Sequence, residues 1–193
     1  MQIVKKKVLK SINQHNLLIK KQTNDIIKKI DIFSKYFINA INNNNKILIA
    51  GNGGSAADAQ HFSTELTVKM KKFRRALPLI SLCTDTSALT AIGNDFSFRK
   101  IFSRQIEAIG NEGDIFVSIS TSGNSANIIE ALKVSRKKKL INLGLLGNKG
   151  GLSKKHIDDA FIVKSSDPSR IQEIHILFYQ NLCQVIEEHF SKI

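Results

Sequence analysis

The stretch ILIAGNGGSAADAQHF, residues 47–62, decides the fold class of this chain. Four apolar residues lead into a glycine-rich turn, and a helical pattern follows the turn directly. A short run that is apolar on both faces is typical of a buried parallel strand. The turn has neither the GxxxxGK[ST] spacing of a P-loop nor the GxGxxG spacing of a dinucleotide-binding turn. The stretch therefore predicts a strand, a tight turn and a helix within an α/β domain.

The same strand–helix pattern recurs along the chain. Further apolar runs cover residues 79–82, 115–119, 140–146 and 160–163, and helical patterns separate them. A last amphipathic pattern, from Ser169 to Phe190, predicts a long helix near the end of the chain. Because strands that alternate with helices form a doubly wound parallel sheet, we expect helices on both faces of that sheet.

Residues 1–45 contain no glycine or proline and keep a helical spacing of apolar residues. A polar break at Gln22–Asn24 predicts two helices, with the second capped within Thr23–Asp25 and ending at Asn42–Asn45. Their apolar stripes must pack on the domain or on another subunit. We therefore expect a helical segment, residues 1–45, that also serves oligomerisation, and an α/β domain, residues 46–193. Together they form effectively one domain.

The composition limits the classes of function. A length of 193 residues suits one domain, and 42% hydrophobic with 23% charged residues excludes a disordered or fibrous chain. The formal net charge of +13 points to nucleic acid, an anionic membrane or acidic metabolites as partners. The basic segment Lys69–Arg75 has one aromatic residue and no accompanying recognition motif. Direct nucleic-acid binding is therefore a third, weaker hypothesis, and residue usage explains part of the charge.

The apolar runs and the cysteines predict the cellular location of the protein. No run approaches the roughly 18 apolar residues of a spanning helix, and the first residues are too charged for a signal peptide. Cys83 and Cys183 are far apart and form neither a metal-binding pair nor a disulfide framework. We expect free buried thiols, no membrane partner and a cytoplasmic protein.

A second strand end, SISTSGNS at residues 118–125, also runs into a helix. Capping that helix needs one hydroxyl, whereas this turn carries several. Hydroxyls and backbone N–H groups at a helix start can bind a phosphate monoester, and ligands bind at the carboxyl ends of parallel strands. Phosphate binding is therefore favoured over capping alone. The candidate binding residues in the two loops are Asn52, Gly53, Gly54, Ser55, Ser120, Thr121, Ser122 and Ser125.

Four ordered motifs carry a resemblance to a known family. GNGGS with DAQHF and EL, then IGNDFSF, SISTSGNSANII and RIQEIHI, resemble the sugar isomerase (SIS) domain family over essentially the whole chain. Within it, the chain is similar to the phosphoheptose isomerases. The resemblance implies a three-layer αβα sandwich with a five-stranded parallel, flavodoxin-like sheet, and a zinc-containing homotetramer. It also implies conversion of sedoheptulose 7-phosphate to D-glycero-D-manno-heptose 7-phosphate, for heptose and lipopolysaccharide precursor synthesis.

The resemblance assigns roles to particular residues. An aldose–ketose isomerase needs a base, an acid and a site for the distant phosphate. Glu65 matches the base, and His61, one helical turn before it, shares its face. The family's zinc is held by positions matching His61, Glu65 and Gln172, together with a further histidine. Asn94 and Asp95 match contacts to substrate hydroxyls. Ser120, Ser122 and Ser125 match the positions with which the family binds the substrate phosphate.

One position departs from the family pattern. The isomerases carry a histidine eight residues after Gln172, as general acid and metal ligand, whereas this chain has Gln180. An amide releases no proton near neutral pH and is a poor zinc ligand, so we expect weaker zinc binding and turnover. His175 lies about 140° away around the helix, so we expect it to be a packed core histidine. The family pocket is completed by neighbouring subunits, so Gln172 and Gln180 are candidates to act across an interface.

A second function stays open on these residues. The family has a non-catalytic branch, a tetramer that binds the replication initiator DnaA, and that branch also lacks the C-terminal histidine. SAADAQHF, LTAI and LCQVIE here are similar to it. However, this chain keeps Glu65, which that branch does not. The primary hypothesis is therefore an isomerase, and the alternative is an initiator-binding tetramer.

Overall fold

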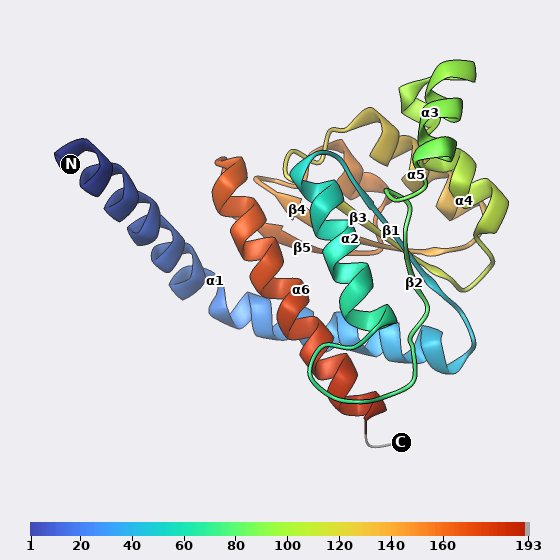
Figure 1. The fold of residues 1–193 in the computed structure, drawn as a ribbon, viewed down its shortest axis with the longest axis horizontal. Helices are drawn as coiled ribbons and strands as arrows, with labels where there is room; N and C mark the ends of the chain where they lie inside the picture. Colours follow the sequence, from blue (N-terminus) through green and yellow to red (C-terminus); the bar gives the residue numbers. More distant parts are fainter. Residues whose placement is uncertain (192–193) are drawn as a thin grey trace.

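The structure, a computed structural model, describes residues 1–191 and is an α/β fold (Figure 1). The last two residues of the expected domain 46–193 lie outside the described part. The elements are α1 (Gln2–Asn42), β1 (Ile47–Gly51), α2 (Gly54–Thr67), β2 (Leu79–Ser81), α3 (Thr86–Asp95), η1 (Phe98–Lys100), α4 (Ser103–Ile109), β3 (Ile115–Ser120), α5 (Ala126–Lys137), β4 (Ile141–Gly147), η2 (Leu152–His156), β5 (Asp159–Val163) and α6 (Pro168–Phe190).

The sheet confirms the predicted fold class. Its five strands lie in the order β2-β1-β3-β4-β5, and every neighbouring pair is parallel. This is the doubly wound, flavodoxin-like order, in which the order of the strands reverses between β1 and β3 while all strands stay parallel. Ligands bind in such sheets at the carboxyl ends of the strands beside that reversal.

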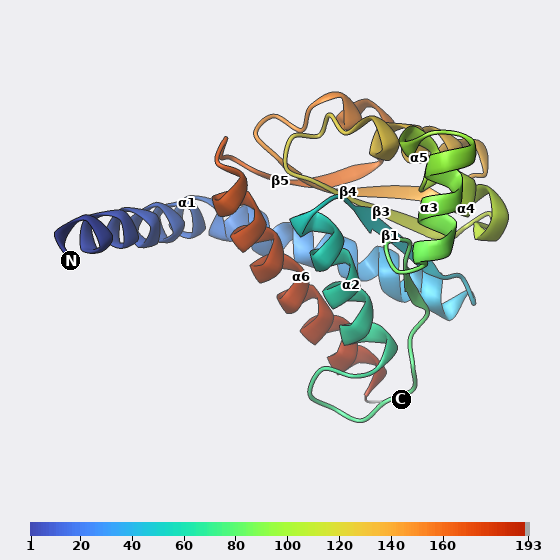
Figure 2. The same ribbon diagram turned by 45° about the horizontal axis from the view of Figure 1, so that its top comes forward.

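Alternating side chains of the strands bury two separate cores. Ile47 and Ile49 of β1 face the layer of α1, α2 and α6, whereas Leu48 and Ala50 face the layer of α4 and α5. Figure 2 shows the two helical layers on opposite sides of the sheet. A strand that is buried on both faces has the unbroken apolar sequence from which it was predicted.

The predicted break in the N-terminal segment is wrong, because α1 is one helix of 41 residues. Thr23 lies inside it and donates to the Ile19 carbonyl at 2.7 Å, so it caps nothing. The buried Gln22 amide donates to the Ile162 carbonyl at 3.0 Å and accepts the Lys164 N–H at 2.9 Å. The polar residue that resembled a break therefore binds the edge of β5.

The two halves of α1 have different surroundings. Phe33 and Phe37 in its second half are buried against the sheet layer, and the helix ends at Asn42 where the sequence predicted. Its first half projects away from the body of the domain (Figure 1). Among the described residues, no helix is long and apolar enough to cross a membrane. Cys83 and Cys183 are free thiols, and Cys183 is the fully buried one.

Candidate functional site

Two loops meet at the carboxyl ends of the neighbouring strands β1 and β3. Gly53 is the N-cap residue of α2 and has a φ of 55°, a left-handed conformation that favours glycine. Asn52 and Asn127 exchange two amide hydrogen bonds of 2.9 and 2.8 Å, which tie the β1 loop to the start of α5. The two predicted binding loops are therefore held side by side.

Neither of the serines at the starts of α2 and α5 caps its helix through its hydroxyl. Ser125 stands at the N-cap of α5 without a side-chain capping bond, and Ser55 lies inside α2 rather than at its cap. Ser120 Oγ accepts the Gly123 N–H at 3.1 Å and lies 3.4 Å from Ser125 Oγ. Beside them, a hollow of about 170 Å³ is lined by Thr121, Ser122, Asn124, Asn148, Ser166, Pro168 and Ile171. Capping therefore does not account for the hydroxyls, and sequence reasoning missed Asn148 and Ser166.

Helix α6 runs beside α2 and brings its residues to the same loops (Figures 1 and 2). Gln172 packs against Gly54 so closely that a Cβ there would lie 2.6 Å from the Gln172 amide nitrogen. Gly54 thus leaves the space that the Gln172 side chain fills. Two turns further along α6, Gln180 reaches α2 again. Both glutamines therefore contact α2 of their own chain.

A hydrogen-bonded cluster lies where Gln180 meets α2. His61 Nε2 is 2.9 Å from Glu65 Oε1, the i,i+4 pair that the sequence predicted. The Gln180 amide nitrogen is 3.1 Å from Glu65 Oε1 and 3.1 Å from His61 Nε2. Tyr179 completes the cluster, because its hydroxyl is 3.0 Å from His61 Nδ1. No sequence pattern marks Tyr179 as a site residue, since it lies in the apolar stripe of α6.

Burial shifts the pKa of two groups beside this cluster. Asp58, one turn before His61, is 7% exposed. Desolvation raises its pKa to about 6, although the electrostatic interaction with His61 acts to lower it. Its Oδ2 is buried and has no hydrogen-bond partner among residues 1–191. Desolvation also raises the pKa of Tyr179, with Asp58 adding to the effect, so its hydroxyl keeps its proton. Asp58 could have been found from its spacing on the His61 face.

Two other predicted residues lie outside this cluster. Asn94 and Asp95 are exposed at the end of α3, where the Asn94 amide donates to Asp95 at 2.9 Å. Helix α3 lies apart from α6 in both views (Figures 1 and 2), and neither residue shares a hydrogen bond with the described cluster around Glu65. His175 is fully buried with Nε2 3.0 Å from the Leu146 carbonyl, which confirms the packed core histidine.

The donor set does not fit a zinc site. Within residues 1–191, no three His, Cys, Asp or Glu side chains gather in a way that could hold a metal ion. His61 and Glu65 provide two strong ligands, while Gln172 and Gln180 add only amides. Catalytic zinc sites use three protein ligands drawn from Cys, His, Asp and Glu. The zinc that the resemblance implies therefore lacks one strong ligand here, and no chemical step is assigned to it.

Comparison with known proteins gives consistent results. The SIS domain family matches residues 11–147. The phosphoheptose isomerase of Aliarcobacter butzleri is 47% identical over 97% of this chain and all of that protein. Phosphoheptose isomerase 1 of Campylobacter jejuni is 48% identical over 95% of this chain and 98% of that protein.

Solved structures extend the likeness to three dimensions. The phosphoheptose isomerase of Neisseria gonorrhoeae is 37% identical, with a TM-score of 0.89 over 96% of this chain and 99% of that one. The enzyme of Francisella tularensis is 32% identical, with a TM-score of 0.92 over 95% and 97% of the two chains. The shared fold includes both helical layers and the sheet between them.

Proposed function

Because this chain belongs to the SIS domain family and, within it, to the phosphoheptose isomerases, we propose that it converts sedoheptulose 7-phosphate to D-glycero-D-manno-heptose 7-phosphate. The reaction moves the carbonyl group from C2 to C1 and supplies heptose for lipopolysaccharide precursors. The observation that carries the proposal is the Glu65 carboxylate, held by hydrogen bonds in the seam between α2 and α6. The same seam begins at the two hydroxyl- and glycine-rich loops.

Glu65 is placed to act as the base. Its carboxylate takes a proton from C1, the C–H electron pair forms the C1–C2 double bond, and the electron pair of the C2=O π bond moves onto O2 to give an enediolate. The same proton returns to C2, while a hydroxyl proton passes from O1 to O2, so no atom is lost. Oε1 already receives hydrogen bonds from His61 and Gln180. Oε2, which receives no hydrogen bond from any described residue, is the oxygen that abstracts the proton.

The loops bind the other end of the substrate. The start of α5 and the hydroxyls of Ser122 and Ser125 offer donors to the 7-phosphate. Gln172 lies at the same end of the seam, against Gly54. Eleven residues separate Gly54 from Glu65, and a rise of about 1.5 Å per residue places them about 16 Å apart along α2. The two ends of the seam are therefore separate, so that Glu65 can meet the carbonyl end of the substrate while the loops meet its phosphate.

Turnover of sedoheptulose 7-phosphate tests this function. We expect the purified protein to form the aldose, observed by NMR, and Glu65→Gln to lower kcat about 10²–10⁴-fold. Glu107→Gln, at an exposed carboxylate of α4, is the matched control and keeps full activity. Ser122→Ala with Ser125→Ala raises KM about tenfold or more, through lost phosphate contacts. Absence of aldose from the wild type, or full activity of Glu65→Gln, would refute the assignment.

The oligomer is proposed from the projecting half of α1. Val4, Val8 and Ile12, spaced four residues apart along one face of α1, are 64%, 50% and 48% exposed, an apolar surface that a lone subunit leaves in water. The direction of this half is fixed, because Arg170 of α6 donates to the Ser11 carbonyl at 2.6 Å. We therefore propose that the apolar surface packs against other subunits of a homotetramer.

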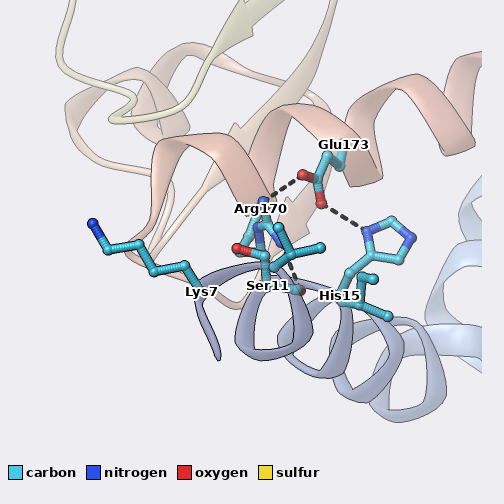
Figure 3. Close-up of a pocket in the computed structure, with 7 residues that line it drawn as sticks. Lys7, Ser11, His15, Arg170 and Glu173 are labelled. Carbon is cyan, nitrogen blue, oxygen red and sulfur yellow. Dashed lines mark hydrogen bonds and ion pairs between the residues drawn. The ribbon is translucent and has the colours of Figure 1, made fainter. Parts of the chain in front are cut away.

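Figure 3 shows the contact that holds α1 to α6. His15 and Arg170 both bind Glu173, at 2.8 and 2.5 Å, beside a hollow of about 420 Å³. Light scattering tests the assembly: Val8→Glu with Ile12→Glu lowers the mass in solution, whereas Lys10→Glu on the same half does not. An unchanged mass for the double variant would contradict the role of this surface.

The alternative function and the cellular location complete the functional assignment. Those that match most of this chain are phosphoheptose isomerases, so they favour the enzyme over the initiator-binding alternative. We propose a cytoplasmic location, supported by the free thiols of Cys83 and Cys183, which oxidising compartments tend to pair. Direct nucleic-acid binding stays a minor prediction.

A further inference from the structure

The arrangement around Glu65 is a continuous chain of hydrogen bonds. It runs from the Tyr179 hydroxyl to His61 Nδ1, and from His61 Nε2 to Glu65 Oε1. The Gln180 amide nitrogen reaches the same carboxylate oxygen from α6. Two neighbouring residues of α6 therefore act on the pair that α2 presents.

The chemistry of the partners fixes the direction of each bond. A carboxylate accepts only, so His61 Nε2, 2.9 Å from Glu65 Oε1, must carry the hydrogen. In a neutral imidazole Nδ1 then has none and accepts from the Tyr179 hydroxyl. Gln180 donates to the charged oxygen, the stronger acceptor, rather than to His61 Nε2, which is itself a donor. Each donor thus has an acceptor.

We propose that this chain of hydrogen bonds holds the catalytic carboxylate in its working orientation, with Tyr179 as a positioning residue, so that isomerisation proceeds without a divalent metal. The inference rests on the proposed isomerase function. Tyr179 selects the His61 tautomer that donates to Glu65, and Gln180 supplies the second bond to Oε1. Oε2 stays available for the substrate.

The packing of Tyr179 makes it suited to this role. Its side chain is fully buried. Its ring stacks on Phe62 at 5.1 Å and 11°, and Phe62 stacks in turn on Phe37 at 5.9 Å and 7°. The His61 ring meets Tyr179 edge to face, with centroids 5.6 Å apart. Because the packed ring holds the hydroxyl in one position, the side chain loses little conformational entropy when the hydroxyl bonds to His61.

The first experiment removes only the hydroxyl of Tyr179. Tyr179→Phe keeps the stacked ring, and Tyr36→Phe in α1 is the matched control. We expect Tyr179→Phe to lower kcat about 10–100-fold with little change in KM, as when other groups that orient a site residue through a hydrogen bond are removed, and Tyr36→Phe to change neither. In ¹⁵N NMR spectra, His61 of the wild type shows the Nε2–H tautomer, and Tyr179→Phe shows a mixture. Wild-type kcat in Tyr179→Phe, or a wild-type Nδ1–H tautomer, would overturn the proposal.

The second experiment concerns the metal. EDTA-treated wild type keeps its turnover, and ZnCl₂ titrated into it by calorimetry gives no tight binding. Gln180→His adds a third strong ligand and gains tight zinc binding, whereas Gln184→His, exposed on the same helix, does not. Loss of wild-type turnover in EDTA with recovery on zinc addition would overturn the inference while leaving the isomerase function intact. No turnover by the wild type with or without zinc would overturn both.

Discussion

Acid pH should destabilise this protein through a single buried histidine. His175 is fully buried in α6, with Nε2 bound to the Leu146 carbonyl at 3.0 Å, and no described residue bonds to Nδ1. Burial lowers its pKa to about 4, although the hydrogen bond to the Leu146 carbonyl acts to raise it. The folded protein therefore keeps this imidazole neutral at pH values where the unfolded chain protonates it.

The size of the effect follows from proton linkage. An unfolded histidine has a pKa of about 6.5, so between pH 6.5 and 4 the unfolded state binds the extra proton. The contribution of neutral His175 to stability is complete above pH 6.5 and is lost as pH falls towards 4. At about 1.4 kcal/mol per pKa unit, the loss is about 2 kcal/mol between pH 7 and pH 5, and about 3 kcal/mol in all.

The titration of Asp58 changes the stability with pH in the direction opposite to that of His175, so the assay needs a variant that isolates the histidine. Burial raises its pKa to about 6, so its contribution to stability is complete below pH 4 and is lost as pH rises through 6. The wild-type curve alone therefore mixes two opposing terms. We expect the difference between wild type and His175→Gln to isolate the histidine, because glutamine can still donate to Leu146 but does not titrate.

Urea unfolding at pH 7 and pH 5, at one protein concentration, measures that difference. The free energy of unfolding of His175→Gln should lose about 2 kcal/mol less than that of the wild type on going to pH 5. His189→Gln, at an exposed histidine of α6, is the control and should follow the wild type. Equal pH dependence in wild type and His175→Gln would refute the assignment of a neutral buried histidine.

Three further predictions concern packing and charge. Glu187→Ala removes the carboxylate that lies 3.7 Å from the buried Arg74 side chain and so leaves that charge without its ion-pair partner. The free energy of unfolding in urea should fall by about 3–5 kcal/mol, and a loss below about 1 kcal/mol would contradict a stabilising ion pair. Gly54→Ala moves the Gln172 amide, which would lie 2.6 Å from the new Cβ, so kcat/KM should fall about tenfold while the melting temperature holds. Although burial alone raises the pKa of Asp114, hydrogen bonds lower it overall, so Asp114→Asn should flatten the loss of stability below about pH 4.

Local sequence pattern was sufficient for the strands and for the loops that follow them. Each apolar run became a strand within about one residue of its expected ends, because a strand buried on both faces must be apolar throughout. The strand order, which the structure shows, then places β1 beside β3 and so brings the 52–55 and 120–125 loops together. The i,i+4 spacing was enough to pair His61 with Glu65.

Tertiary structure decided the rest. The break at Gln22 vanished because its amide found backbone partners on β5, a long-range contact that no helical pattern contains. Tyr179 looked like a core residue, and it is one. Only the parallel packing of α6 against α2 places its hydroxyl on His61 and brings Gln180 to Glu65. Periodicity reports which face of a helix is buried, whereas the groups that meet across that face depend on how two helices pack.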